Sequence, residues 1–450
     1  MFNVKGKDVL VLGLGASGYS SCELLIRNGA KVRISESSEH ESICQRINLL
    51  GPCLAGYETG GHTPLFCSKA EIVVISPGID PEPLYLKGIL GKKSLVISEL
   101  ELGYLFCPAP IIAITGTNGK STTTKLIGHI LDVFGRHTVV CGNIGNPLTG
   151  EVGKMTEQSI AVVEVSSFQL EAIRAFNPYI AILLNVSEDH YERHGDYEGY
   201  KNEKFKIFQN QTSSEWAVLN AEFQRDKRAG EIKGQTVFWG DEQTSAFVCD
   251  GKIFSNMHKK KTTVMSVKDI PVKGNHNLEN ILASIVAAKI MGVDDEIIRE
   301  GIIGFKALKH RFEKIADFKG IEIFDDSKAT NIDAASRALE FVNKKAILIA
   351  GGRDKGGDYS LILPLALEKV KTMVLIGEAA DKIEKVFSSI VPCLKAKDMA
   401  EAVRIGFNEA GEGDCLLLSP MCSSFDMYTS YKERGEAFRR EVFSCIEDNQ

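Results

Sequence analysis

Short runs of apolar residues recur along the chain, and each run is followed by a turn and then by a helical pattern. The first run, Val9–Leu12, leads into the turn Gly13–Gly18 and a helical stretch, and a second strand is predicted at Lys31–Ser35. A run that is apolar at every position is typical of a strand covered on both faces of a parallel sheet. Strands that alternate with helices in this way predict a doubly wound α/β fold.

The middle of the chain shows the same alternation. The pattern predicts strands at Ile111–Ile114, Ile160–Val165 and Tyr179–Val186, and an amphipathic helix at Leu278–Val286. Residues 236–272 differ, because they consist of short, polar, turn-rich pieces such as Val237–Gly240. We interpret these pieces as a small antiparallel appendage.

The last third of the chain again alternates strands and helices. Strands are predicted at Ile321–Phe324, Ala346–Ala350, Met373–Ile376 and Asp414–Ser419. The sequence therefore predicts an α/β protein of three domains: Rossmann-like at 1–98, a P-loop mononucleotide-binding domain with the antiparallel appendage at 99–307, and Rossmann-like again at 308–450.

The strongest chemical signal follows the strand that begins at Ile111. The segment Gly116–Thr122 combines a Gly-rich turn, a lysine and hydroxyl side chains at the start of a helix, whose pattern becomes clear at Lys125. Backbone N–H groups and the helix dipole bind phosphate there, Lys120 adds a charge, and a hydroxyl can hold Mg²⁺. Ile114 replaces the first glycine of the common motif. The segment still predicts a nucleoside triphosphate site.

Two further turns lie at the ends of strands in the first domain. Gly13–Gly18 is a complete G-x-G-x-x-G, and Glu36 follows about 20 residues later, as in dinucleotide-binding folds. Ser76–Gly78 follows another apolar strand, where a ligand contact and a plain turn are equally compatible with the residues. Taken alone, this domain suggests NAD binding.

The strands of the central domain also end in polar residues. Glu164 lies near the end of a buried strand, where a carboxylate is costly unless it is paired or binds a metal. In P-loop proteins such a carboxylate often meets Mg²⁺. The next strand leads into Ser187–His190, and His190 is either a metal ligand or a surface histidine.

Composition narrows the classes of function. The 450 residues include 53 basic and 59 acidic ones, a net charge of −6, so we expect neither a nucleic-acid nor a membrane partner. The N-terminus does not have the pattern of a signal peptide, and no apolar run is long enough to span a bilayer. The 11 cysteines lack C-x-x-C pairs, which favours reduced thiols and a cytoplasmic location.

Together these motifs resemble the Mur ligase family, ATP-dependent ligases that add amino acids to the peptidoglycan precursor. The resemblance covers essentially the whole chain through Gly116–Thr122, Glu164–Glu171, Asn185–His190, Gly274–Asn277, His310–Glu313, Asp325–Asn331, Gly351–Gly356 and Leu418–Pro420. The short first domain, Ser424–Tyr428 with Tyr431, and the lack of a D-N-P-R motif resemble the branch that adds D-glutamate to UDP-N-acetylmuramoyl-L-alanine.

The resemblance implies a reaction through an acyl phosphate, which releases ADP and then phosphate. It implies that ATP is bound by Gly116, Thr117, Asn118, Gly119, Lys120, Ser121, Thr122, Asn277, Asn280, Arg311 and Asp326. It implies two Mg²⁺ ions, held by Ser121 or Thr122 with Glu164 and by His190, beside Lys204 as a carbamate. Lys120, His190, Lys204 and Lys328 are the implied catalytic residues. By composition alone, Lys204 is one of three solvated lysines.

The resemblance also implies where the other substrates bind. The UDP-linked substrate would contact Ser17, Ser37, Ser38, Ser76, Gly78, Asn143 and His190, and D-glutamate would contact Thr330, Lys355, Ser424 and Tyr431. Each small polar residue among these is also a common turn or cap residue. Ser38 stands where relatives can have an arginine, so one phosphate contact is missing or replaced.

Other functions remain open at this stage. They are another ligase of the family, a ligase similar to folylpolyglutamate synthase, an NAD-dependent oxidoreductase, and a regulatory P-loop protein without chemistry. We expect a monomer whose outer domains close around the central one, with hinges near Ser98 and Lys306.

Overall fold

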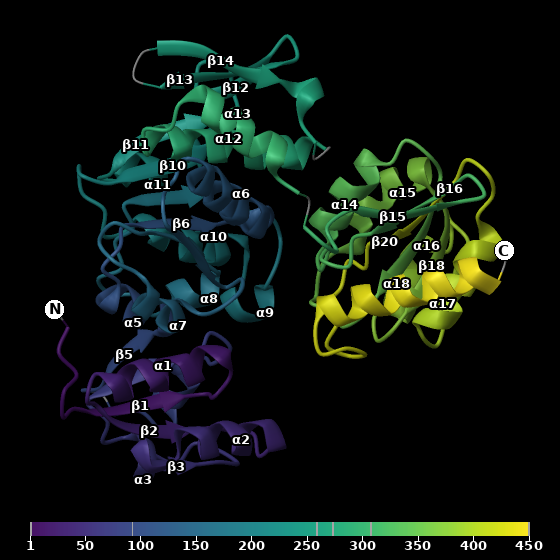
Figure 1. Ribbon diagram of the computed structural model, residues 1–450. Coiled ribbons are helices and arrows are strands. Elements are labelled where there is room, and N and C mark those ends of the chain that lie inside the picture. Colours follow the sequence, from purple (N-terminus) through teal and green to yellow (C-terminus); the bar gives the residue numbers. More distant parts are fainter. Residues whose placement is uncertain (1, 92, 258–259, 272–273, 307, 449–450) are drawn as a thin grey trace. The chain divides into compact units, whose positions relative to one another are not determined.

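The computed structural model describes residues 2–91, 93–257, 260–271, 274–306 and 308–448 (Figure 1). The chain forms two compact units, which are described separately. The first unit contains Met1–Asn185, Lys201–Pro271 and Leu278–Phe305, and the second contains Val186–Tyr200, Val272–Asn277 and Lys306–Gln450. The segment that follows the third predicted central strand, including His190, thus belongs to the second unit.

The first sheet of the first unit is entirely parallel, as its buried apolar strands predict. Its strand order is β3-β2-β1-β4-β5, formed by β1 (Asp8–Leu12), β2 (Lys31–Ser35), β3 (Leu54–Glu58), β4 (Ile72–Ile75) and β5 (Leu95–Ser98). The connecting helices are α1 (Ala16–Arg27), α2 (Glu41–Leu50), α3 (Pro64–Cys67) and α4 (Pro81–Leu86). Strand β1 lies in the middle, so the turn that follows it opens at the centre of the sheet.

The second sheet of the first unit has the order β11-β10-β9-β6-β8-β7 and is also parallel. Its strands are β6 (Ile111–Thr115), β7 (Thr138–Gly142), β8 (Ile160–Glu164), β9 (Ile180–Leu183), β10 (Trp216–Asn220) and β11 (Gln235–Trp239). The helices along this part of the chain are α5 (Glu99–Phe106), α6 (Lys120–Val133), α7 (Leu148–Glu151), α8 (Ser167–Leu170), α10 (Tyr197–Phe205), α11 (Lys227–Glu231), α12 (Asn275–Ile290) and α13 (Asp295–Gly304). Helix α9 (Tyr191–His194) lies in the second unit.

The predicted antiparallel appendage is present but smaller than expected. It consists of β12 (Ala246–Cys249), β13 (Lys252–Met257) and β14 (Lys260–Ser266), paired antiparallel in that order. The assignment of Val237–Gly240 to it was wrong, because β11 pairs parallel with β10 in the central sheet. An edge strand has only one neighbour and is half exposed, so it lacks the continuous apolar pattern of a buried parallel strand.

The sheet of the second unit is mixed, with the order β15-β16-β20-β17-β18-β19. Its strands are β15 (Glu313–Phe318), β16 (Ile321–Asp325), β17 (Ala346–Gly351), β18 (Val370–Ile376), β19 (Cys393–Lys395) and β20 (Cys415–Leu418), and β15 alone among the described strands of this sheet pairs antiparallel. Its helices include α14 (Ile332–Phe341), α15 (Leu363–Lys369), α16 (Ala380–Phe387), α17 (Met399–Glu409) and α18 (Tyr431–Asp448).

Alternate residues of β17 explain why helices cover both faces of this sheet. Leu348 packs in a core with residues of α14, α15 and α16, whereas Ile347 and Ile349 pack in a second core with residues of α17 and α18. Side chains of a strand alternate between faces, so a strand that is apolar throughout needs helices on both sides. The predicted third doubly wound domain is confirmed, with the addition of one antiparallel edge strand.

Two buried carboxylates fix the start of α5, the helix that directly follows β5. Glu99 and Glu101 in the first turn of α5 are each only 1 % exposed. The Glu99 carboxylate accepts hydrogen bonds of 2.7 Å from the backbone N and the Oγ1 of Thr149. Glu101 accepts three hydrogen bonds, of 2.7 to 2.9 Å, from the backbone N–H groups of residues 174–176. These hydrogen bonds fix the first turn of α5 to Thr149 and to residues 174–176, and the hinge near Ser98 stays a prediction.

We predict that Glu101→Ala destabilises the central sheet by about 3 kcal/mol, because three buried N–H groups lose a charged acceptor. Both tryptophans of the chain, Trp216 and Trp239, lie in that sheet, so urea unfolding followed by their fluorescence measures the loss. The exposed Glu157 offers a matched control, since Glu157→Ala should leave the midpoint unchanged. Equal midpoints for both variants would show that the Glu101 contacts contribute little.

Candidate functional site

The predicted phosphate loop joins β6 to α6. Gly116 and Gly119 have φ angles of +155° and +83°, and a Cβ atom at Gly119 would collide with Oδ1 of Asn280. Helix α6 begins at Lys120 and not near Lys125, because the tract of threonines hid the helical pattern in the sequence. Its N-terminal N–H groups therefore lie directly at the loop, where a helix binds anions.

Two lysines converge on this loop. Nζ of Lys120 donates to the carbonyl oxygens of Gly116 and Thr117 at 2.7 and 2.8 Å. Nζ of Lys204, on α10, donates to the same Gly116 oxygen at 2.9 Å and is only 1 % exposed. The reading of Lys204 as a solvated lysine was wrong. Two neighbouring ammonium groups in a buried place repel each other, which makes a change of charge at one of them favourable.

The other two lysines of the same stretch have different surroundings. Lys201 forms an ion pair of 2.5 Å with Asp226, and Lys206 forms one of 2.7 Å with Glu203. In the described part of the chain, Lys204 thus donates to the phosphate loop, whereas Lys201 and Lys206 pair with carboxylates.

Glu164 ends β8, where the register places it opposite Ile114 of β6, two residues before the loop. Its Oε1 accepts a hydrogen bond of 2.7 Å from Nδ2 of Asn143. Its Oε2 is buried and accepts no hydrogen bond from any described residue. An unsatisfied carboxylate oxygen beside a phosphate loop fits a cation, since Mg²⁺ binds carboxylate, hydroxyl and phosphate oxygens.

The hydroxyl side chains predicted to hold Mg²⁺ lie directly after the phosphate loop. Ser121 and Thr122 are buried in the first turn of α6. Within the described ranges, no group of three or more His, Cys, Asp and Glu side chains could hold a metal. A magnesium site needs no such group, because the ion keeps waters and takes ligands from phosphates.

The glycine turn after β1 is closely packed on one side. Gly13 has a φ of +81°, and a Cβ there would lie 2.9 Å from Oγ of Ser76. Ser76 itself donates to the Gly13 carbonyl at 3.0 Å. Gly15 is the N-cap residue of α1 and provides no side-chain cap, and a Cβ on it would meet nothing within 4 Å. Ser76 thus packs against the turn, Ser17 lies in the first turn of α1, and a Cβ on Gly78 would meet nothing within 4 Å.

Glu36, at the end of β2, is tied to this turn. Its carboxylate accepts from the backbone N of Leu14 at 2.6 Å and of Ser38 at 2.9 Å, and from Oγ of Ser37 at 3.2 Å. Burial raises the pKa of Glu36, but these hydrogen bonds outweigh it and lower the pKa below the ordinary value. The predicted residues Ser37 and Ser38 therefore lie beside a fixed negative charge.

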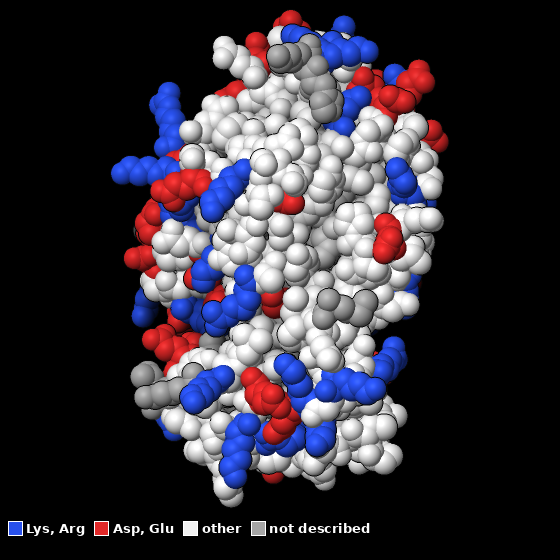
Figure 2. Space-filling view, turned by 90° about the vertical axis from the view of Figure 1, so that its left-hand side faces the viewer, with Lys and Arg blue, Asp and Glu red and all other residues white. Residues whose placement is uncertain are grey.

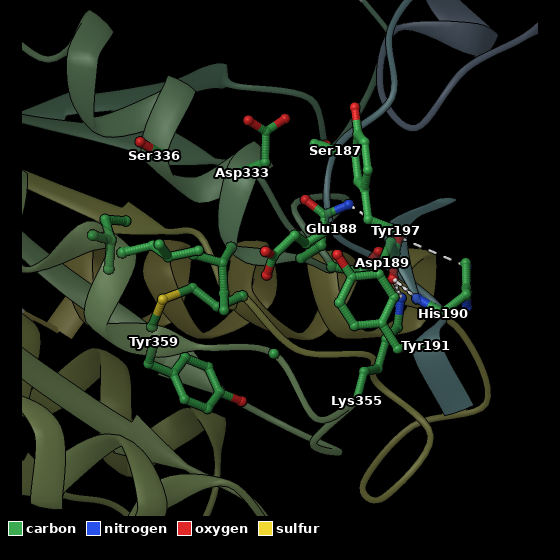
Figure 3. A pocket seen from close by; sticks show the side chains of 17 residues that line it. Ser187, Glu188, Asp189, His190, Tyr191, Tyr197, Asp333, Ser336, Lys355 and Tyr359 are labelled. Carbon is green, nitrogen blue, oxygen red and sulfur yellow. Dashed lines mark hydrogen bonds and ion pairs between the residues drawn. The ribbon is translucent and has the colours of Figure 1, made fainter. Parts of the chain in front are cut away.

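The second unit contains a cavity of about 320 Å³, shown in Figure 3. Its polar wall includes Asp189, His190 and Lys355, and its apolar wall includes Ile362 and Met421. Thr330 and Lys355, predicted to bind D-glutamate, are among the lining residues, whereas Ser424 and Tyr431 are not.

An ion pair organises the polar wall of this cavity. Nζ of Lys355 lies 3.1 Å from Oδ1 of Asp189, and Nδ2 of Asn331 donates to Oδ2 of Asp189 at 3.1 Å (Figure 3). Burial raises the pKa of Asp189, but Lys355 and His190 outweigh it and lower the pKa. Burial lowers the pKa of His190, which favours the neutral imidazole that metals require.

The other predicted residues of the second unit lie on neighbouring loops. Asp326 is buried, and accepts from the backbone N of Phe312 at 3.0 Å and from Oγ of Ser419 at 3.2 Å. Lys328 lies with Nζ 4.1 Å from the ring centre of Tyr431. Arg311 lies between two residues with positive φ, His310 and Phe312. Of the remaining predicted residues, Asn277 lies in the first turn of α12 and Asn280 lies beside Gly119. Ser424 is buried.

The sequence analysis gave no role to Arg434, His310 or Asp325, which the structure places at these loops. Arg434 is 1 % exposed and donates to the backbone oxygens of Ser327, Cys422 and Ser423, so it joins two of the predicted loops. Nδ1 of His310 lies 2.6 Å from the buried Asp325. Both histidine and aspartate stand in recognised motifs, whereas Arg434 lies in a helical pattern that resembles any polar helix face.

Charge outside these sites is mixed. On the face drawn in Figure 2, Lys and Arg side chains alternate with Asp and Glu side chains, and its described residues form no continuous basic surface. No described helix is long and apolar enough to cross a membrane.

The fold and the phosphate loop define a P-loop nucleotide-binding α/β protein. Three domains of one family match the chain: the Mur ligase MurD-like N-terminal domain at 7–98, the Mur ligase middle domain at 114–288, and the Mur ligase glutamate ligase domain at 310–422. The chain is 39 % identical, over the full length of both proteins, to the UDP-N-acetylmuramoylalanine--D-glutamate ligase of Koribacter versatilis. It is also 39 % identical to the ligase of that name from Desulfitobacterium hafniense, over 98 % of both chains. The chain belongs to the Mur ligase family.

Solved structures share the fold at low identity. MurF from Acinetobacter baumannii has a TM-score of 0.63 and 17 % identity, over 98 % of this chain and 91 % of that chain. MurF from Thermotoga maritima in complex with ADP has a TM-score of 0.60 and 18 % identity, over 99 % and 96 %. The G-x-G-x-x-G motif lies within the residues matched by the MurD-like N-terminal domain.

We predict that Asp326 makes the stability of the second unit depend on pH. Burial raises its pKa to about 8, despite hydrogen bonds from Phe312 and Ser419, so the folded state keeps a proton that the unfolded state loses. Its contribution therefore falls as pH rises between about 4 and 8, by up to about 1.4 kcal/mol per pH unit. Calorimetric unfolding of Asp326→Asn should show a flatter pH dependence than the wild type.

The exposed Glu412, in the same unit, offers the control. Glu412→Gln should retain the wild-type pH dependence. Parallel pH profiles for wild type and Asp326→Asn would mean that Asp326 is ionised in the folded protein.

Proposed function

We propose that this protein is the ATP-dependent ligase that joins D-glutamate to UDP-N-acetylmuramoyl-L-alanine in the cytoplasmic synthesis of the peptidoglycan precursor. The observation that carries the proposal is 39 % identity along the whole chain to relatives of that name. The residues that would bind the three substrates are spread over all three matched domains, so similarity along the full length bears on each of them.

The proposed reaction has two steps. The substrate carboxylate attacks the γ-phosphate of ATP and gives an acyl phosphate and ADP; the amine of D-glutamate then attacks the acyl carbon, loses a proton, and phosphate leaves. Both steps bring anionic groups together, so cations and oriented dipoles provide most of the catalysis. Lys120 and the N–H groups of residues 116–122 would hold the β- and γ-phosphates at the N-terminus of α6.

Two Mg²⁺ ions would neutralise charge on the phosphate oxygens and on the acyl phosphate. The buried Oε2 of Glu164 and the hydroxyl of Ser121 or Thr122 fit one ion. His190, whose pKa burial lowers, fits the second. Lys204 as a carbamate would replace one of two adjacent ammonium groups by an anion, which the contacts on the Gly116 oxygen favour.

The cavity of the second unit would receive D-glutamate. The Lys355 ammonium would bind a substrate carboxylate, and that carboxylate would replace Asp189 as its partner. Thr330 would contact the same substrate from the cavity wall, and Ser424 and Tyr431 from neighbouring loops. Arg311, Asp326, Asn277 and Asn280 would contact ATP, and Lys328 would stabilise the transferred phosphate.

The UDP-linked substrate would bind on the first unit. Ser17, Ser37, Ser38, Ser76 and Gly78 would surround its nucleotide at the turn after β1, and Asn143 would contact its sugar–peptide part. Asn143 is held by Glu164 at 2.7 Å, so the acyl end of the substrate would lie beside the proposed magnesium ligand.

The direct test is phosphate release from ATP with UDP-N-acetylmuramoyl-L-alanine and a panel of amino acids. We expect D-glutamate to be preferred over L-glutamate by more than about 100-fold, because a polar site that fixes both carboxylates rejects the wrong stereoisomer. Omission of the UDP-linked substrate is the control and should abolish the release. Faster release with L-alanine or L-lysine would contradict the proposed function.

Lys204→Ala should lower turnover by about 100-fold or more, because the charge next to the metal ions is lost. Formate or acetate should restore part of the activity by supplying a carboxylate. Lys206, paired with Glu203 on the same stretch, provides the control, and Lys206→Ala should remain close to wild type. Full activity of Lys204→Ala, or the absence of any rescue by small carboxylates, would remove the carbamate from the mechanism.

A further inference from the structure

Under the proposed function, the diphosphate of the UDP-linked substrate lacks a positively charged partner in the turn after β2. The family resemblance implies that Ser38 stands where relatives can have an arginine, and the polar groups of Ser38 are used within its own turn. Its backbone N donates to Glu36 at 2.9 Å, and its Oγ accepts from the backbone N of His40 at 3.2 Å. Ser38 therefore brings no charge to the glycine turn.

The negative charge of Glu36 makes a cation there more necessary. Its carboxylate lies 2.6 Å from the backbone N of Leu14, inside the turn Gly13–Gly18. A diphosphate bound at this turn would lie close to that carboxylate and be repelled by it. A compensating positive charge has to come from another element.

Arg46, on α2, lies at this place. Its Nη1 donates to the carbonyl oxygen of Leu14 at 2.6 Å, across 32 residues of sequence. The side chain is half-buried, so the guanidinium is held against the turn. Among the described residues, no carboxylate lies within ion-pair distance of it, and the Leu14 oxygen is its one hydrogen-bond partner.

The turn beside Arg46 is open to an anion. Helix α1 has 12 residues and begins at Ala16; its N-cap residue, Gly15, provides no side-chain cap, and its first turn has no acidic residue. A Cβ atom on Gly15 would meet nothing within 4 Å. Leu14, which Arg46 contacts, immediately precedes this helix start, so the guanidinium and the N–H groups of α1 are adjacent.

We propose that Arg46 replaces the missing arginine and binds the diphosphate of the UDP-linked substrate from α2. The guanidinium has five N–H donors, and one of them is used by Leu14, so a bidentate contact with phosphate oxygens remains open to it. The positive charge thus reaches the diphosphate from a different element than in relatives that have the arginine after β2. This assignment rests on the proposed function, because it takes the UDP-linked substrate as the ligand.

The test compares UDP with uridine on the full-length protein. Arg46→Ala should weaken UDP binding, measured by calorimetry, by about 10- to 100-fold. Uridine binding, followed by ligand-observed NMR, should change by less than about twofold, because uridine carries no phosphate. Gln45→Ala changes the neighbouring exposed residue of α2 and should leave both affinities unchanged.

A relocated arginine tests whether charge is the cause. The double variant Ser38→Arg/Arg46→Ala should regain most of the UDP affinity. In turnover, Arg46→Ala should raise KM for the UDP-linked substrate with kcat little changed, and binding of a non-hydrolysable ATP analogue should stay as in the wild type.

Two patterns of results would overturn the assignment. One is unchanged UDP affinity in Arg46→Ala. The other is an equal loss for UDP and uridine with no recovery in the double variant, which would show that Arg46 only supports the turn. If the wild type itself neither binds UDP nor releases phosphate with the UDP-linked substrate, the proposed function fails as a whole, and that outcome differs from both patterns.

Discussion

A parallel sheet that is covered on both faces leaves chemistry only at the carboxyl ends of its strands, and the sites of this protein follow from that constraint. Strand β1 ends at the glycine turn, β6 ends at the phosphate loop, and β8 ends at Glu164. In the second unit, β16 ends at Asp325 and leads directly into the loop that carries Lys328 and Thr330. The interior positions are apolar because burial requires it, so the few polar residues at these ends are the ones available for the proposed binding and catalysis.

Charges within the protein prepare these ends for anionic ligands. Lys355 is already paired with Asp189, Lys120 with the carbonyls of its own loop, and Arg46 with the Leu14 carbonyl. An anion that binds any of these cations exchanges one partner for another. The binding free energy is therefore a difference between two interactions, and each cation is oriented before the ligand arrives. The strength of the Asp189–Lys355 pair therefore affects how tightly an anion binds to Lys355.

The sequence predicted what sterics and burial impose. Fully apolar runs located β6, β8 and β17, and the glycine motifs located both turns, because glycine adopts the positive φ of Gly13 and Gly119 without the strain that a side chain brings. Edge strands were missed or misplaced, as β11 was, since half-exposed strands lack a continuous apolar pattern. The Asp189–Lys355 pair joins residues 166 apart in sequence, and no local pattern connects them. Such pairs require the tertiary fold.

A steric requirement fixes which residue can stand at one position, whereas an electrostatic requirement can be met by a charge from more than one position. Gly18 has no alternative, because a side chain there would collide with the Gly13 carbonyl, so it can be recognised in a single sequence. A diphosphate requires a cation within reach of its oxygens, and Coulomb attraction does not depend on which element supplies it. An arginine on α2 can then replace one in the loop after β2, because both elements border the same turn. The loss at Ser38 is implied by resemblance of motifs alone, whereas the compensation proposed for Arg46 rests on its contact with Leu14, which only the tertiary fold reveals.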